Sequence, residues 1–319
     1  MTQGKNIAIV ESVSKYYSEV VAVNQLSMTV SEGITGFVGP NGAGKSTTIK
    51  MLTGEIKPSS GHVWVFGENP QDNVALKSRI GYVSEAEAVY PWMTAEYFVY
   101  ALTKMTLPRE VAKKVSETAL KTVDLWNVRT RKCGTFSKGM KQRLKVAQAL
   151  AHDPEFIIAD EPLAGMDPLG RNHLIELFQD LTKRGKHILI SSHVLHEVQK
   201  ISEKVVLIYR GRSIAEGKVE EIRGLIDRHP HHIRVIANPL DKLAELLINT
   251  KPRLIKSVEF NFDQETGVGS LMFLTHTPER FYSEIPKIVT ENKIHLSYIS
   301  SQDDSLEAVF QYLVKPEGE

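Results

Sequence analysis

The stretch Gly39-Pro40-Asn41-Gly42-Ala43-Gly44-Lys45-Ser46-Thr47 decides the interpretation of this chain. It fits the pattern G-x-x-x-x-G-K-[ST], in which a glycine-rich loop surrounds nucleotide phosphates. Its glycines allow the backbone to curl so that successive N–H groups point at an anion. The helix expected over Lys45 to Thr53 offers its positive N-terminal end to the same phosphates. A short apolar strand, Ile34 to Val38, precedes the loop, so the sequence predicts a strand–loop–helix unit that binds a nucleotide.

Two side chains of this stretch have individual tasks. Lys45 supplies a positive charge near the β- and γ-phosphates. The Ser46 hydroxyl is placed to ligate Mg²⁺. The remaining residues are expected to contact the nucleotide through the loop and the start of the helix: Gly39, Pro40, Asn41, Gly42, Ala43, Gly44 and Thr47.

A second strand supplies the carboxylates of the expected site. The strand Glu155 to Ala159 is followed directly by Asp160 and Glu161. Because the carboxyl ends of parallel strands face the crevice where α/β sheets bind ligands, these acids should lie beside the phosphate loop. We expect Asp160 to hold Mg²⁺ and Glu161 to polarise the attacking water. A solvated turn is the alternative interpretation, and the phosphate loop disfavours it.

Three further residues have both a structural and a functional interpretation. His193 follows an expected strand, where it could reach a γ-phosphate, although a lone histidine is usually structural. Ser137 is a suitable N-cap for a helix expected to run to about Ala151, and this capping role alone would explain it. Tyr17, in the segment Lys15 to Ser18 between two expected strands, could stack on a purine or cover a strand end, and spacing favours neither.

Bulk composition limits the classes of function. The chain has 319 residues, of which 42% are hydrophobic and 24% charged, as in an ordinary globular protein with one large and one smaller domain. A net charge of +1 gives no indication of a nucleic-acid partner, because proteins that bind the phosphate backbone usually carry a strong excess of basic residues. The single cysteine, Cys133, excludes an internal disulfide bond. We find no signal-peptide pattern and no apolar stretch of about 18 residues, so any membrane work would need a partner.

A helical segment is expected between the two halves of the nucleotide site. Thr94 is a suitable N-cap for its first helix, and Pro108 precedes a second helix expected over Arg109 to Val123. Aromatic residues gather where this segment begins: Tyr90, Trp92, Tyr97, Phe98 and Tyr100. They could form a groove for a partner helix or belong to the core, and the sequence favours neither.

The composition changes near Asp227. His229 to His232 is interpreted as a linker, since no further metal ligands gather there. The order strand, helix, strand, strand, helix, strand then predicts a small ferredoxin-like domain, closed by an amphipathic helix over Leu306 to Val314. The expected domains are therefore residues 1–226 and 227–319, with no catalytic pattern in the second.

Together, these motifs resemble those of the ATPase subunit of an ABC transporter over residues 5–225. Gly39 to Thr47 is similar to that family's Walker A motif, Phe156 to Glu161 to its Walker B motif, and Thr135 to Gln142 to its signature motif. The resemblance implies an α/β P-loop NTPase fold with a RecA-like core, an antiparallel β subdomain and a helical subdomain. The α+β ferredoxin-like domain would follow it.

The resemblance also implies roles for single residues at a bound ATP. Tyr17 stands at the A-loop, which stacks on the base, and His193 stands at the switch histidine. Ser137 and Gly139 of the signature motif would supply a hydroxyl and a backbone N–H to the γ-phosphate. Asp167, expected as the N-cap of a helix to about Arg184, stands in the D-loop. The implied ligands are ATP and Mg²⁺.

Two positions depart from the family pattern. Glu85 stands where the family usually has the glutamine of the Q-loop. Its carboxylate can still take part in catalysis as a Mg²⁺ ligand, but it adds negative charge near the γ-phosphate. The signature motif has Lys138 and Met140 where the family usually has Gly and Gln.

The partners follow from the same resemblance. A separate transmembrane permease would hold the subunit at the cytoplasmic face of the cell membrane. The ending Ser305 to Phe310 is similar to that of drug-resistance-type exporter ATPases, which favours export. The helix capped by Ser137 and the helix after the phosphate loop cannot crowd one γ-phosphate within a single domain. The signature motif is therefore expected to complete the site of a second copy, giving a homodimer when ATP binds.

Other classes of function fit the sequence less well. ABC proteins that act on ribosomes usually carry two nucleotide domains in one chain, and this chain has one phosphate loop. Those that act on chromosomes insert a long coiled coil before the signature motif, and the segment from Lys45 to Ser137 is too short for one. A nucleotide sensor would be expected to lack Asp160, Glu161 or His193. We therefore favour an ATP-hydrolysing motor subunit over a regulatory or translation-associated ABC ATPase.

Overall fold

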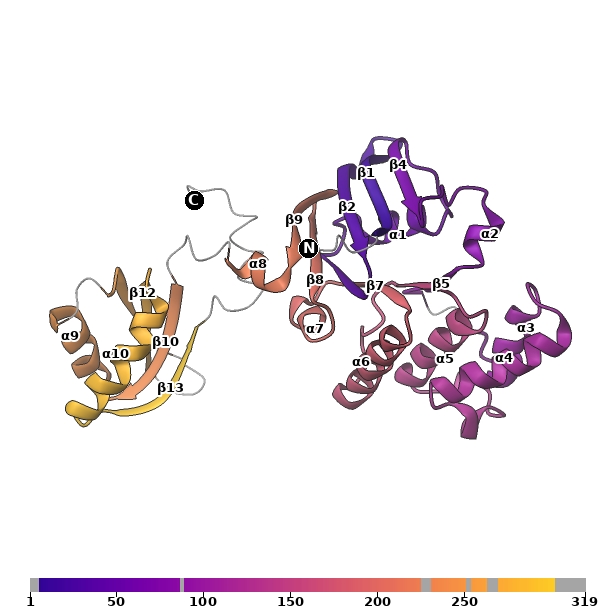
Figure 1. Ribbon diagram of the computed structural model, residues 1–319. Helices are drawn as coiled ribbons and strands as arrows, with labels where there is room; N and C mark the ends of the chain where they lie inside the picture. Colours follow the sequence, from indigo (N-terminus) through magenta and orange to yellow (C-terminus); the bar gives the residue numbers. More distant parts are fainter. Residues whose placement is uncertain (1–5, 87–88, 225–230, 251–253, 263–268, 302–319) are drawn as a thin grey trace. The chain divides into compact units, whose positions relative to one another are not determined.

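The computed structural model describes residues 6–86, 89–224, 231–250, 254–262 and 269–301 (Figure 1). The chain divides into two compact units, residues 1–217 and 218–319. The domain boundary expected between residues 226 and 227 stays a prediction, because residues 225–230 lie outside the described part. The closing helix expected over Leu306 to Val314, and the exporter-like ending, also lie outside it.

A six-stranded sheet forms the centre of the first unit. In sheet order, its strands are β5 (Ile80–Val83), β6 (Phe156–Ala159), β7 (His187–Ser192), β3 (Ile34–Val38), β8 (Lys204–Tyr209) and β9 (Arg212–Lys218). The strands from β5 to β8 pair in parallel, so their carboxyl ends meet at one edge of the sheet. The segments that follow β3, β5, β6 and β7 are thereby brought together at that edge.

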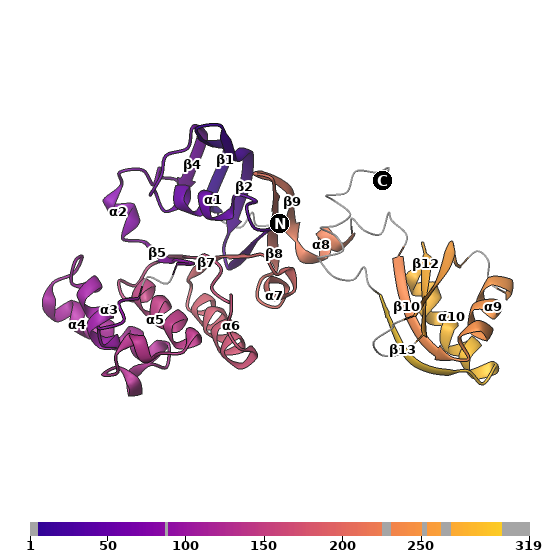
Figure 2. The same ribbon diagram turned by 180° about the vertical axis from the view of Figure 1, so that it is seen from behind.

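One face of this sheet packs against helix α1 and a smaller sheet (Figures 1 and 2). The smaller sheet is antiparallel and consists of β2 (Val20–Ser31), β1 (Asn6–Tyr17) and β4 (Ser60–Val65). Helix α1 (Lys45–Leu52) buries Ile49, Met51 and Leu52 in the same core as Phe37 and Leu189. Burying these side chains stabilises the start of α1 directly behind the phosphate loop.

Helices α5 (Lys138–Leu150) and α6 (Pro168–Lys183) pack on the opposite face of the six-stranded sheet. Helices α3 (Ala95–Thr103) and α4 (Arg109–Thr122) pack against α5, and the four together form a helical layer (Figure 1). Ile157, Ile188 and Ile190 point to this face, because successive residues of a strand alternate between the two sides of the sheet. Thr94, Ser137 and Asp167 accept hydrogen bonds at the starts of α3, α5 and α6, as the sequence predicted for these N-caps.

The second unit begins with a short helix, α8 (Val219–Gly224). Its further elements are β10 (His231–Asn238), α9 (Leu240–Thr250), β11 (Ser257–Phe262), β12 (Gly269–Thr275), α10 (Pro278–Glu291) and β13 (His295–Ser301). The strands form one sheet in the order β11-β12-β10-β13, and the pairings are antiparallel. This succession of elements is the one expected for a ferredoxin-like domain.

Several expectations about local structure were wrong. His231 belongs to strand β10 rather than to a linker, because it pairs with Thr275 of β12. Strand β1 continues through Lys15 to Tyr17, which were expected between strands, because these residues pair with β2. Among the described residues, five short elements were not expected: helices α2 (Val74–Lys77), α7 (Leu195–Gln199) and α8 (Val219–Gly224), and single 3-10 turns at Trp126–Val128 and Cys133–Thr135. An element this short contains no repeating apolar pattern from which to predict it.

Within the described residues, none of the helices combines the length and the apolar composition needed to cross a membrane.

Candidate nucleotide site

The phosphate loop joins the central strand β3 to helix α1. Gly44 is the N-cap of α1 at φ 105°, and no side chain caps this helix end. A Cβ at Gly44 would lie 2.6 Å from the Ala22 carbonyl oxygen, so both the backbone angle and the space require glycine. Gly42 also has a positive φ, 79°. The first N–H groups of α1 are therefore left to face an anion.

A cavity of about 550 Å³ lies against this loop. The lining includes most of the residues that the sequence predicted: Tyr17, Asn41, Gly42, Gly44, Lys45, Ser46, Thr47, Glu85 and Glu161. Val20, Val21 and Ala22, at the start of β2, also line it, and the sequence analysis missed them. They stand beside Tyr17 because β1 and β2 form a hairpin, and this pairing is what places the tyrosine at the cavity.

Gly39, Pro40 and Ala43 shape the loop rather than the lining of this cavity. Lys45 Nζ donates hydrogen bonds to the carbonyl oxygens of Gly39 (2.7 Å) and Pro40 (3.3 Å). Ala43 is buried in the core beside β3 and α1. The loop therefore holds the lysine that the phosphates are expected to contact.

Lys45 and Glu161 form a buried ion pair at the end of the cavity. Lys45 Nζ lies 3.3 Å from Glu161 Oε1, and both side chains are more than 90% buried. The other carboxylate oxygen of Glu161 lies 2.9 Å from His193 Nδ1. The structure thus joins a cation, an acid and a histidine that lie far apart in the sequence. Glu161 has a φ of 48°, which is uncommon for a residue with a side chain.

Ser191, at the end of β7, links the two acids that follow β6. Its hydroxyl donates to Asp160 Oδ1 at 2.5 Å and accepts from the Glu161 backbone N–H at 2.8 Å. Ser191 and Asp160 are buried, so the serine fixes the orientation of both acids. Ser191 was not predicted from the sequence. A polar residue at the end of the apolar strand His187–Ser192, next to His193, was the available signal.

The oxygen donors near the cavity fit Mg²⁺. In nucleotide sites this ion is usually held by one or two carboxylates together with the phosphates. Ser46 and Glu85 line the cavity. Asp160 is buried directly after β6 and precedes Glu161, which also lines the cavity. In the part of the chain that the structure describes, no group of three His, Cys, Asp or Glu side chains could hold a metal alone. This agrees with a metal that takes some of its ligands from the protein and the others from the phosphates of a nucleotide.

The charge of Asp160 also affects a neighbouring phenol. Burial raises the pKa of Tyr82, in strand β5, to about 12, and the charges of Asp160 and Glu55 contribute. The phenol therefore stays protonated at neutral pH and adds no negative charge beside the acids.

The expected signature residues stand apart from this cavity. Ser137 caps α5, where its Oγ accepts a hydrogen bond from Met140 N at 3.3 Å, and it is exposed. Asp167 caps α6 and accepts from Gly170 N at 3.1 Å. A Cβ at Gly139 would lie 3.3 Å from the Met166 side chain, so the start of α5 and the segment before α6 are neighbours. Among the described residues that line the cavity, none belongs to these two segments.

The fold and the site define an α/β protein that binds a nucleotide through a phosphate loop. The sequence matches the family described as ABC transporter over residues 23–164. It is 32% identical to the bacitracin transport ATP-binding protein BcrA of Bacillus licheniformis, over 95% of this chain and 95% of that protein. It is 36% identical to an uncharacterized ABC transporter ATP-binding protein of Nostoc sp., over 68% of this chain and 65% of that protein. A solved ATP-binding subunit of an ABC transporter superposes with a TM-score of 0.61 and 28% identity, covering 69% of this chain and 93% of that one.

This chain belongs to the ATP-binding proteins of ABC transporters. The resemblance drawn from the motifs is thereby confirmed, and so is the α/β P-loop fold that it implied. Members of this family bind and hydrolyse ATP and work with membrane permeases.

We expect Lys45→Ala to reduce ATP hydrolysis at least about 100-fold and to weaken nucleotide binding, because a buried charge that faces the phosphates is lost. Phosphate release and titration with a fluorescent ATP analogue measure the two effects. Lys50→Ala, an exposed lysine of the same helix, is the matched control and should behave as wild type. Wild-type hydrolysis by Lys45→Ala would contradict the assignment of the loop.

We expect Ser191→Ala to lower the turnover rate about tenfold or more while leaving metal-free nucleotide binding within about twofold, because both acids lose their shared hydroxyl. The control is Ser202→Ala, which removes a buried hydroxyl bonded to Val198 O, away from the site. Both variants should lose about 1–3 kcal/mol of folding free energy, measured by denaturant unfolding. Equal turnover in the two variants would show that Ser191 is structural only.

Proposed function

We propose that this chain hydrolyses Mg-ATP at an interface between two copies and thereby drives a separate membrane permease. The observation that carries the proposal is the convergence of Lys45 and His193 on Glu161, whose carboxylate lines the cavity together with Lys45. Lys45 would move to the phosphates when they enter, which frees Glu161 to accept a proton from the attacking water. His193, half exposed at the same carboxylate, would orient that water and the γ-phosphate. Mg²⁺ bound at Ser46, Glu85 and Asp160 would neutralise the phosphate charge.

The other end of the cavity suits the base. Tyr17 is 45% exposed, and the Lys15 ammonium lies 5.4 Å from the centre of its ring. An exposed ring at the rim of a cavity can stack on a purine, whereas a ring that only covered a strand end would be buried. This favours the stacking role for Tyr17 over the covering role.

The exposed position of Ser137 supports a site shared between two copies. Ser137 is exposed, and no described residue of α5 lines the nucleotide cavity of its own chain. In a head-to-tail pair, the start of α5 of one copy would close the cavity of the other over the γ-phosphate. ATP would then be bound by both copies and would favour dimerisation until it is hydrolysed.

We expect Glu161→Gln to be a monomer without nucleotide and a dimer with Mg-ATP, at near-zero turnover. The substitution removes the proposed base and leaves in place the groups that are expected to bind the phosphates. Light scattering with and without Mg-ATP measures the change in mass. The double variant Glu161→Gln with Ser137→Arg is the control and should stay monomeric, because a bulky charge blocks the shared surface. If Glu161→Gln does not pair with a second copy in Mg-ATP, either alone or in the complex with the permease, the shared site is contradicted.

The permease would contact the exposed aromatic residues at the start of the helical layer. Trp92 is 67% exposed, and Tyr90 and Tyr97 are about half exposed. Phe98 is buried, so of the two alternatives that the sequence left open for this residue, the core is the one that holds. Its ring lies 6.2 Å from that of Tyr90, which in turn lies 5.4 Å from Trp92. The exposed rings are therefore anchored to the core and suit a stable contact.

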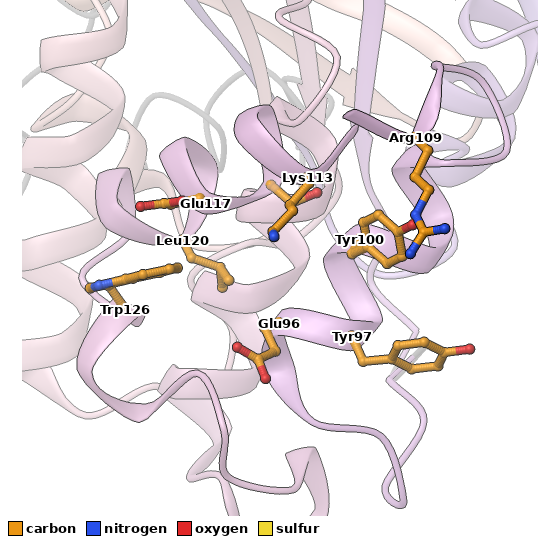
Figure 3. A pocket seen from close by; sticks show the side chains of 9 residues that line it. Glu96, Tyr97, Tyr100, Arg109, Lys113, Glu117, Leu120 and Trp126 are labelled. Atoms are coloured by element: carbon orange, nitrogen blue, oxygen red, sulfur yellow. The ribbon is translucent and has the colours of Figure 1, made fainter. Parts of the chain in front are cut away.

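A cavity of about 400 Å³ between α3 and α4 continues this surface (Figure 3). Figure 3 shows Tyr97 and Tyr100 on one helix, with Lys113 and Leu120 on the other. The acids that line it already have partners: Glu96 pairs with Arg129 and Glu117 with Lys121. Among the described residues, neither Arg109 nor Lys113 forms an ion pair within 4 Å, although the hydrogen bond from Lys121, and to a smaller extent the charge of Lys113, lowers the pKa of Glu117. The cavity therefore favours an acidic side chain on the permease segment.

We expect Trp92→Ala to fold normally and to keep the ATPase rate of the isolated subunit, but to lose stimulation by the permease at least about tenfold. Removing a large exposed ring weakens a partner contact and leaves the core intact. The assay compares the rates of the isolated subunit and of its complex with the permease in lipid vesicles. Val74→Ala, at an 80% exposed position on α2, is the matched control. Unfolding of Trp92→Ala, or unchanged stimulation, would contradict this surface.

We further propose that the transporter works as an exporter, with this subunit on the cytoplasmic face of the membrane. The ending Ser305 to Phe310, which is similar to that of drug-resistance-type exporter ATPases, supports this direction.

A further inference from the structure

Lys145 is a buried cation in the middle of helix α5. It is only 5% exposed, although lysine is rarely this buried in folded proteins. Its ammonium group lies 2.6 Å from the Ser84 carbonyl oxygen, 3.2 Å from that of Ala86 and 3.4 Å from that of Glu85. One side chain of the helical layer thus holds three consecutive residues that follow strand β5.

The geometry of Ser84 to Ala86 matches the donors of an ammonium group. An ammonium carries three N–H donors, and a buried cation is costly unless these donors are satisfied. The Ser84 hydroxyl accepts a hydrogen bond from the Ala86 backbone N–H at 3.1 Å, which closes a tight turn. Within this turn, the three carbonyl oxygens point to one centre. Hydrogen bonds from a charged donor are roughly twice as strong as neutral ones, so the turn is held firmly.

Glu85, in the middle of this turn, stands where two cavities meet. It lines the nucleotide cavity of about 550 Å³ together with Lys45 and Ser46. It also lines a second cavity of about 160 Å³, whose wall includes Lys145. Glu161 belongs to both linings. Glu85 itself is exposed, so the packing of its own side chain does not determine where its carboxylate lies.

We propose that Lys145 is a positioning residue, which holds the backbone of Ser84 to Ala86 so that the Glu85 carboxylate reaches the metal of a bound Mg-ATP. The proposal rests on the function proposed above. A ligand on an exposed turn loses conformational entropy when it binds a metal, and a backbone fixed beforehand reduces that cost. The placement of the Glu85 carboxylate must be accurate, because a negative charge that misses the metal would repel the γ-phosphate.

The same helix connects this turn to the shared site. Ser137 caps α5 and Lys145 lies about 12 Å further along its axis, at about 1.5 Å per residue. A helix of this kind moves as a rigid unit, so a shift of its capped end is passed to the Glu85 turn. Closure of one ATP site by α5 would in this way adjust the metal ligand of the neighbouring site.

The test measures metal binding without turnover. In a Glu161→Gln background, Mn²⁺ is titrated into the full chain with excess ATP and followed by electron paramagnetic resonance. We expect Lys145→Met to weaken Mn²⁺ binding about 10-fold to 100-fold, as is typical when the support of a metal ligand is removed. Binding of ATP without metal should change less than about twofold, since the phosphate loop is untouched.

Arg143→Met is the matched control on the same helix. Arg143 also donates to a backbone carbonyl, that of Val123, but it faces the helical layer rather than the Glu85 turn. It should leave Mn²⁺ binding within about twofold of the background. Lys145→Arg, which keeps the charge and the donors, should restore part of the lost affinity.

A double-mutant cycle decides whether Lys145 acts through Glu85. Glu85→Ala should weaken Mn²⁺ binding to a similar extent as Lys145→Met, and the combination should add less than about twofold, because the ligand to be positioned is already absent. Fully additive losses would overturn the proposal, and so would unchanged Mn²⁺ binding in Lys145→Met. If Lys145→Met does not fold, Ser84→Ala tests the same turn from the other side, with the same expected loss and the same dependence on Glu85.

The outcome can be separated from a failure of the proposed function. If the wild-type chain hydrolyses ATP and Lys45→Ala does not, the proposed function is supported regardless of how the Lys145 substitutions affect Mn²⁺ binding. A wild-type chain that neither binds nor hydrolyses Mg-ATP would remove the basis of both.

Discussion

The buried ion pair between Lys45 and Glu161 constrains the phosphate loop, the position of His193 and the order of the strands that carry them. Two charges taken out of water must be compensated by each other and by hydrogen bonds, otherwise burial costs several kcal/mol per ion. Here the loop carbonyls of Gly39 and Pro40 satisfy the ammonium, and His193 satisfies the second carboxylate oxygen. These partners come from the ends of β3, β6 and β7, so the pair requires the parallel sheet order that the structure has.

The nucleotide cavity draws on more than one layer of the first unit. The antiparallel sheet supplies Tyr17 and the start of β2, and the edge of the parallel sheet supplies Glu85 and Glu161. The helical layer supplies no residue to the described lining, and instead carries the exposed aromatic residues and the capped start of α5. The residues proposed for the chemistry and those proposed for the partner contact thus belong to different layers, and the hydrogen bond from Lys145 to Ser84 O joins the two layers.

The sequence predicts what depends on neighbours along the chain. The bounds of β5, the caps Thr94, Ser137 and Asp167, and the phosphate loop follow from local patterns. The order of the motifs along the chain then predicts that Glu85, Glu161 and Lys45 lie together, and the structure has them in the lining of one cavity. Ser191 and Lys145 escaped prediction because their tasks are contacts across 31 and 61 positions, which leave no local pattern. Lys145 in particular has the sequence context of an ordinary lysine on a helix.

The left-handed backbone of Glu161 has a consequence for evolution. A non-glycine residue in a sparsely populated backbone region costs about 1–3 kcal/mol, which the surrounding ion pair and hydrogen bonds must outweigh. The fold therefore gives up stability at the residue that we propose as the catalytic base, which would be a trade between stability and activity. A descendant that lost catalysis could relax this strain with a glycine at position 161. Heat resistance combined with a glycine there would be the mark of a chain that keeps the nucleotide-binding fold but no longer works as a motor.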